Sequence, residues 1–506
     1  MAHKTLPCDE LPLLDPPIDL PKGKQPIFGP AVAVIVFHGM GQQVKFQTLN
    51  DVAYGIRDAV VRAGQTLARP HTVLLRQHAP NDDCKYIPRA ELEIDGIVPT
   101  QIHIYECYWA PLTEGKATLR DVAKFLIKAG VDGFRLGARR FQRIVFGDWK
   151  SLSIERTTRW QFAVALGFVL SLIGLNMVLG LVTSVGVLRG ADSGWPGQAL
   201  VHWLSVDFAV FEVAAFLFAA SAYLAYRRWD RFRQSHARTR ATQWTLRGKT
   251  LYLALAWGFV LATIACGFAA LVLLLRFRVS DEAPTPLGLL FFAVIAIASA
   301  VSWVVRSFLV QYAGDVVVYV SAHSVSQFDE LRTTIQKTAL NVANAVYAQG
   351  IYQHVILLGH SLGSVIAYDT FNALTNEGSH HELLRRTDLI TFGSPLDKTA
   401  FVFRSQKVAH ADFREALATQ IQAALVSSDN RPASWTNVFS KDDWISGKLN
   451  FYGQAQLRNG ESDLQNREDT EACIPIVAHV QYWRNNLVFD TVVEKIQAVR
   501  ADMMRV

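Results

Sequence analysis

One serine of this chain stands in a sequence context that favours nucleophilic chemistry. Ser361 is the centre of the pentapeptide Gly359-His360-Ser361-Leu362-Gly363. An apolar, β-branched run precedes this pentapeptide, and an apolar helical pattern follows it directly. A serine on a sharp turn between a strand and a helix presents its hydroxyl, and the flanking glycines allow the strained turn. The pattern therefore indicates a nucleophile elbow.

A second segment offers donors for a developing oxyanion. Residues 31–37 form a continuous apolar run that predicts a buried strand, and His38-Gly39-Met40-Gly41 follows it. With an elbow of this kind, one backbone N–H comes from a loop after an early strand and another from the residue after the serine. We therefore predict that Met40 and Leu362 form the oxyanion hole. We expect His38 to support the shape of the loop.

These two motifs give the chain a family resemblance. With an HG-type oxyanion loop and a Gly-His-Ser-Leu-Gly elbow, the chain resembles an α/β-hydrolase of the lipase or esterase kind over roughly residues 31–120 and 315–490. The resemblance implies an α/β fold with a mostly parallel sheet flanked by helices. It also implies a catalytic triad in the chain order Ser, Asp or Glu, His, and hydrolysis of acyl esters or related bonds. It does not imply a particular substrate.

The acid of such a triad is expected just past a late strand. Residues 435–439 predict a strand, and it runs into a segment with two adjacent carboxylates, Asp442 and Asp443. We select Asp443, because the sequence Asp-Trp-Ile-Ser-Gly that it opens resembles a turn common in lipases. Asp442 is the close alternative. Residues 388–395 predict the strand after the elbow helix, and Asp397, just past it, is a more remote alternative.

The base is expected near the C-terminus, after the acid. His479 lies there in a short apolar segment and is followed by Tyr482 and Trp483, an order that lipase-like chains often show. We therefore predict that His479 is the general base. Other histidines lie in segments that do not follow the acid: His354, His360, His380 and His381. The residues predicted to support the site without taking part in the chemistry are His38, Gly39, Gly41, Gly359, His360 and Gly363.

Several further segments predict the elements around these motifs. Residues 71–75 and 101–108 are typical of strands, and residues 46–63 and 328–348 are typical of helices. The second helix leads into the strand before Ser361. This gives the alternation of strand and helix that produces a mostly parallel sheet.

The middle of the chain predicts a membrane insertion within the hydrolase domain. Four apolar segments, at about 161–188, 206–226, 251–275 and 287–305, are each long enough to cross a bilayer. The domains expected are a proline-rich lead-in at 1–30, the two halves of the hydrolase domain at 31–159 and 311–506, and a four-helix transmembrane insertion at 160–310.

Charged residues predict the orientation of these spans. The segment 227–249 carries eight Lys or Arg residues and one acid, whereas the other connections are poor in basic residues. Such a loop stays in the cytoplasm. Because four spans return the chain to the side on which it started, both halves of the hydrolase domain are expected to face the cytoplasm. In a bacterial cell this would be an integral protein of the inner membrane.

Composition argues against several other classes of protein. The net charge is +6, but the basic residues gather beside the apolar segments, which does not favour a nucleic-acid partner. Residues 1–30 contain seven prolines and no apolar core of a signal peptide. The pattern of the cysteines favours neither a zinc site nor a disulfide framework, and we expect no cofactor and no metal. The cysteines are Cys8, Cys84, Cys107, Cys266 and Cys473.

The leading hypothesis is a membrane-anchored serine hydrolase that cleaves acyl esters through an acyl-enzyme. Spans beside the site favour lipid esters as substrates and the bilayer as the partner. Two alternatives stay open at this point. The same triad serves thioesterases and acyltransferases, and an inactive hydrolase fold could act as a membrane scaffold.

Overall fold

The structure is a computed structural model in which part of the 506-residue chain is described. The chain divides into two compact units, residues 1–114, 141–152 and 318–506 in the first and residues 115–140 and 153–317 in the second. The segments described are 31–40, 43–68, 74–78, 87–96, 99–113, 116, 141–145, 148–152, 319, 326–399, 422, 424, 428–443, 445–453, 464–473 and 478–505.

The predicted lead-in and the four predicted spans lie outside these described residues. Among the helices that are described, none has the length and apolar character that crossing a bilayer requires.

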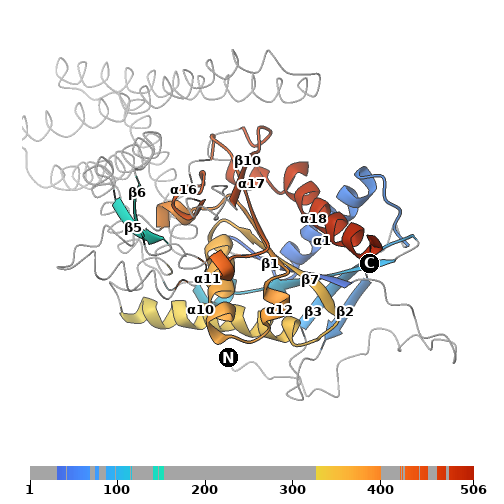
Figure 1. Cartoon of the computed structure of the whole chain (residues 1–506), viewed down its shortest axis with the longest axis horizontal. Coiled ribbons are helices and arrows are strands. Elements are labelled where there is room, and N and C mark those ends of the chain that lie inside the picture. Colours follow the sequence, from blue (N-terminus) through green and yellow to red (C-terminus); the bar gives the residue numbers. More distant parts are fainter. Residues whose placement is uncertain are drawn as a thin grey trace, which may run out of the picture. The chain divides into compact units, whose positions relative to one another are not determined.

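The first unit is built on an eight-stranded sheet with the order β10-β9-β8-β7-β1-β4-β3-β2 (Figure 1). Neighbouring strands from β10 to β4 pair in parallel, and β3 and β2 add an antiparallel edge. The strands are β1 (Ala31–Phe37), β2 (Leu74–His78), β3 (Ile87–Ile94), β4 (Thr100–Cys107), β7 (Tyr352–His360), β8 (Thr387–Phe392), β9 (Ser434–Phe439) and β10 (Leu464–Glu468). A separate antiparallel pair joins β5 (Phe141–Val145) to β6 (Asp148–Leu152).

The central strands are apolar because both faces of the sheet are covered. Every residue of β1 is buried, as is most of β7, and such continuous β-branched runs are typical of parallel strands between helical layers. Helices α1 (Gln47–Arg62) and α18 (Asn486–Arg505) pack together on one face, and α10 (Ser326–Tyr347) and α11 (Leu362–Glu377) lie on the other (Figure 1). The shorter helices are α2 (Ala110–Thr113), α12 (His381–Leu384), α16 (Asn450–Gly453), α17 (Ala478–Gln481) and a 3-10 turn at Ser428–Asn430.

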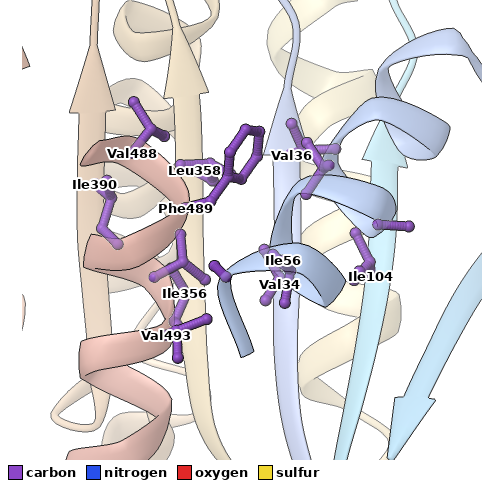
Figure 2. Packing of buried hydrophobic residues seen from close by; sticks show 14 of the residues in the cluster. Val34, Val36, Ile56, Ile104, Ile356, Leu358, Ile390, Val488, Phe489 and Val493 are labelled. Atoms are coloured by element: carbon purple, nitrogen blue, oxygen red, sulfur yellow. The ribbon is translucent and has the colours of Figure 1, made fainter. Parts of the chain in front are cut away.

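One hydrophobic core cluster lies between the sheet and the pair α1 and α18. Figure 2 shows strand residues two positions apart pointing to the same side, where they meet both helices. Burying one such aliphatic or aromatic side chain stabilises the fold by about 1.5–3 kcal/mol. This packing fixes the central strands, whose carboxyl ends carry the site described below. The labelled side chains are Val34, Val36, Ile56, Ile104, Ile356, Leu358, Ile390, Val488, Phe489 and Val493.

The prediction of an α/β fold with a mostly parallel sheet flanked by helices is confirmed. This mixed sheet is compatible with an α/β-hydrolase-like fold.

Candidate active site

The connection between β7 and α11 is strained at Ser361. The backbone of this serine has φ 53° and ψ −126°, a conformation that residues with a side chain rarely adopt. Such an outlier costs of the order of 1–3 kcal/mol and persists only where the surroundings impose it. The strand ends at His360 and the helix begins at Leu362, so the turn contains a single residue. This is the geometry of a nucleophile elbow.

The two glycines of the elbow are required by close packing. A Cβ on Gly363 would collide with the backbone carbonyls of Phe37 and His38, at the end of β1. A Cβ on Gly359 would lie 2.5 Å from the Cα of Ser364, in the first turn of α11. Any larger residue at either position would therefore push the helix away from the strand.

The structure brings Ser361, His479 and Asp443 together. Nε2 of His479 lies 2.7 Å from Oγ of Ser361, and Nδ1 of the same ring lies 2.8 Å from Oδ2 of Asp443. Both contacts have hydrogen-bond length. All three side chains are buried, with His479 the most exposed at 7%. The imidazole thus links a hydroxyl on one side to a carboxylate on the other.

The surroundings of Asp443 keep its carboxylate ionised. Burial alone would raise the pKa of Asp443, but the charge interaction with His479 and hydrogen bonds from His479, Ser446 and the Ile445 N–H lower it well below its usual range. The Ile445 N–H donates to Oδ1 at 2.8 Å. A permanently charged acceptor holds the proton on Nδ1 of His479 and leaves Nε2 free to accept the proton of Ser361.

The two alternative acids have other contacts. The backbone N–H of Asp442 donates to Oγ of Ser440, and no hydrogen bond between Asp442 and His479 is present among the described residues. Asp397 accepts hydrogen bonds from the N–H groups of Asn450 and Phe451 and so holds the start of α16. Of the three carboxylates considered from the sequence, only Asp443 contacts His479 in this part of the chain.

One serine ties together the two loops that carry the acid and the base. Oγ of Ser440 donates to the carbonyl of Ala472 at 2.5 Å and accepts from the N–H of Asp442 at 3.0 Å. Ala472 belongs to the segment that leads toward His479. Asp469 braces the same segment, because its Oδ1 accepts from the N–H groups of Glu471 and Ala472. The contact between Asp443 and His479 is therefore held by both loops.

The predicted oxyanion loop is locked to the end of β4. The rings of His38 and Trp109 stack with centroids 4.7 Å apart, the backbone N–H of Trp109 donates to Nε2 of His38, and the indole N–H donates to the His38 carbonyl. Nδ1 of His38 in turn donates to the carbonyl of Gly39 at 2.8 Å. Because Nε2 accepts, this tautomer is neutral. Burial lowers the pKa of His38 to about 4, although the hydrogen bond to Gly39 partly opposes this.

This loop lies against the nucleophile. A Cβ on Gly39 would stand 3.0 Å from Cβ of Ser361, so Met40 follows a residue in contact with the elbow. Leu362 is the first residue of α11, where backbone N–H groups have no partner within the helix and the helix dipole favours negative charge. The roles of Met40 and Leu362 as oxyanion donors stay predictions. Gly41 lies outside the described residues.

Three contacts were not foreseen from the sequence. Nε2 of His360 donates to the backbone carbonyl of His479 at 3.0 Å, and burial, followed by the nearby His479, lowers the pKa of His360 to about 3. The stack of Trp109 on His38 joins strands far apart in the chain. The hydroxyl of Tyr482 donates to Oδ2 of Asp443 at 3.1 Å. Only the last has a sequence signal, because Tyr482 follows His479 by three residues, about one helical turn.

A second cluster of the same residue types lies at the other end of the parallel strands, where the strands begin. Asp388, at the start of β8, accepts from Nε2 of His354 at 2.8 Å and from the hydroxyl of Ser434 at 2.6 Å. His354 and Ser434 lie near the starts of β7 and β9. Here the carboxylate, and not the imidazole, is the central group.

No family model matches this chain, and no curated protein or solved structure compared with it is significantly similar.

Proposed function

We propose that this protein is a serine hydrolase that cleaves acyl esters by way of an acyl-enzyme. The observation that carries the proposal is the single imidazole of His479 between Oγ of Ser361, at 2.7 Å, and Oδ2 of Asp443, at 2.8 Å. The strained conformation of Ser361 at a strand-to-helix turn supports the same assignment.

The first half of the reaction forms the acyl-enzyme. Nε2 of His479 takes the proton of Ser361 while Oγ bonds to the carbonyl carbon of the ester. The carbonyl oxygen becomes an oxyanion that the N–H groups of Met40 and Leu362 stabilise. The tetrahedral intermediate then expels the alkoxide, which leaves as the alcohol with the proton from His479.

The second half returns the enzyme to its starting state. Water gives a proton to Nε2 of His479 as its oxygen attacks the acyl carbon. The new tetrahedral intermediate releases the carboxylic acid, and the proton returns to Ser361. Asp443 stays ionised throughout and stabilises the imidazolium.

The proposed substrate class is lipid acyl esters at a bilayer. The support comes from the sequence, since four apolar segments interrupt the hydrolase domain and would hold the site beside the membrane. In this proposal the hydrolase unit lies on the cytoplasmic side, because the basic segment 227–249 favours that face.

Hydrolysis of p-nitrophenyl esters with short, medium and long acyl chains by the full chain in detergent tests this proposal. We expect turnover by the unaltered protein and by Ser434→Ala, loss of turnover in Ser361→Ala, and a preference for longer acyl chains. Cleavage of an acyl thioester in place of the ester would favour the thioesterase alternative. A folded protein without turnover on any of these substrates would contradict the proposal and favour the scaffold reading.

A further inference from the structure

Tyr482 and His479 donate to the same carboxylate oxygen. Oδ2 of Asp443 receives Nδ1 of His479 at 2.8 Å and the hydroxyl of Tyr482 at 3.1 Å, while Oδ1 receives the N–H of Ile445. Asp443 is 1% exposed, so protein groups supply its hydrogen bonds. The charge on Oδ2 is therefore divided between the imidazole and the phenol.

Packing fixes the direction of this phenol. Tyr482 is fully buried, and its ring lies edge-on to Phe392, with centroids 6.2 Å apart, and to His360, with centroids 6.5 Å apart. Gly393 packs closely against another side of the ring, because a Cβ at that residue would stand 3.1 Å from a ring carbon of Tyr482. A ring confined on these sides has one orientation for its hydroxyl. That orientation places the hydroxyl against Asp443.

The phenol stays protonated and can only donate to the carboxylate. Burial, followed by the charge of Asp443, raises the pKa of Tyr482 well above its ordinary value. The hydroxyl of Ser446 lies 3.1 Å from the phenolic oxygen. Since the phenol uses its proton on Asp443, Ser446 is placed to donate to that oxygen. Ser446 also hydrogen-bonds Asp443, so its single proton serves both the phenolic oxygen and the carboxylate.

We propose that Tyr482 is a positioning residue that shares the negative charge of Asp443 with His479 and holds the carboxylate in the plane that the imidazole needs. The inference rests on the proposed function, because it concerns how the triad is tuned. Without the phenol, Oδ2 becomes a stronger acceptor for His479 and stabilises the imidazolium further. The acid limb of a pH–rate profile would then lie at higher pH, and the imidazole would be less firmly oriented.

In the described part of the chain, other titratable groups lie near Asp443 and His479, and a test variant must leave them unchanged. His360 faces His479 from β7, with ring centroids 5.1 Å apart. Lys398 donates to the carbonyl of Ser446 at 3.0 Å. Neither is altered by a Tyr482→Phe substitution, which removes one oxygen atom and leaves the ring contacts in place.

Tyr347→Phe is the matched control. Tyr347 is 2% exposed, and its hydroxyl lies 2.7 Å from Oγ1 of Thr387, at the start of β8 and away from the triad. Both variants lose one buried hydroxyl together with the hydrogen bonds that it makes. A purely structural role for Tyr482 predicts that the two variants behave alike.

The test is the rate at which a fluorophosphonate inactivates the full chain in detergent, measured from about pH 5 to pH 9. For Tyr482→Phe we expect the acid limb of the profile to move upward by about half a pH unit and the plateau rate to fall roughly 3- to 10-fold. For Tyr347→Phe we expect the profile of the unaltered protein. If Tyr482→Phe does not fold, Ser446→Ala should move the limb in the same direction by a smaller amount.

Two results would overturn the inference alone. One is an acid limb that stays in place in both Tyr482→Phe and Ser446→Ala, and the other is an equal displacement in Tyr347→Phe. Failure of the proposed function looks different, because the unaltered protein would then not react with the fluorophosphonate at any pH.

Discussion

Two clusters of serine, histidine and aspartate lie at opposite edges of one sheet, and they differ in which residue is central. At the carboxyl ends of the strands, called the carboxyl edge below, the imidazole of His479 lies between Ser361 and Asp443. At the amino ends of the strands, called the amino edge below, the carboxylate of Asp388 lies between His354 and Ser434. The same residue types therefore produce two different arrangements.

Under the proposed function, this difference in hydrogen-bond partners decides which serine acts as the nucleophile. The proton of Ser434 is held by a carboxylate, a weak base, and no histidine contacts that hydroxyl among the described residues. The hydroxyl of Ser361 lies 2.7 Å from Nε2 of His479, and an imidazole is the side chain that most often serves as a general base. The backbone differs as well, because Ser434 begins a regular strand whereas Ser361 has a positive φ.

The largest expected effect separates the two serines. Ser361→Ala removes the proposed nucleophile, and ester hydrolysis should fall by about 10⁴-fold or more. Ser434→Ala should leave the rate within about twofold, since that hydroxyl only stabilises a carboxylate. Steady-state turnover of both purified variants measures this contrast. Equal losses in the two variants would remove the distinction between the clusters.

The second contrast concerns the two carboxylates. Asp443→Asn keeps the size of the side chain but no longer holds the proton on Nδ1 of His479, and activity should fall by about 10³- to 10⁴-fold. Asp388→Asn should chiefly lower the free energy of unfolding, by about 1–3 kcal/mol, because His354 and Ser434 lose a charged acceptor. Turnover and chemical denaturation of each variant check both statements. Full activity in Asp443→Asn would contradict the assignment of the acid.

Neither the acid nor its partners could be deduced fully from the sequence. The chain order of serine, acid and base pointed to the segment 440–447, but Asp442 and Asp443 are neighbours and only the fold shows which side chain reaches His479. The contacts of His360 and Trp109 join residues 119 and 71 positions apart, respectively, and no local pattern reports them. The pairing of His354 with Asp388 depends in the same way on adjacent strands.

The strands could be predicted from the sequence where burial on both faces of the sheet requires a continuous apolar run. Strand β1 and the strand before Ser361 are apolar on both faces, so their runs are conspicuous. Strands β3 and β10 lie at or next to the edges of the sheet and contain several polar residues, so no continuous apolar run marks them in the sequence. Strand β2 extends to His78, past its predicted end at residue 75, because pairing with β3 sets its length.

The third contrast concerns stability in acid, where the loss should come from histidines at the carboxyl ends of the strands. Burial lowers the pKa of His360 to about 3 and that of His38 to about 4, against 6.5 in the unfolded chain. Between these values and pH 6.5 the unfolded chain binds more protons, so the free energy of unfolding falls as the pH falls. The loss is of the order of several kcal/mol over that range.

Denaturant titrations at a series of pH values measure this loss. His360→Gln keeps a side-chain donor but removes a titrating group, so the slope of unfolding free energy against pH should be shallower below pH 6.5. An unchanged slope in His360→Gln would show that this ring is not held neutral in the folded state.

The smallest expected effect is on the amino edge. Ser434→Ala removes one hydrogen bond to a charged acceptor, and the free energy of unfolding should fall by about 1–2 kcal/mol. Thermal unfolding of this variant beside the unaltered protein measures the change. A loss much larger than this would indicate that Ser434 has a further role in positioning β9.

The most direct test of the central claim is to locate the serine that reacts. The full chain in detergent is treated with a fluorophosphonate, digested, and analysed by mass spectrometry to find the phosphonylated residue. The triad described here predicts modification of Ser361, and loss of that modification in His479→Ala while Ser434 stays unmodified in every sample. Modification of another residue, or none in the folded protein, would contradict the assignment of Ser361, His479 and Asp443 as a catalytic triad.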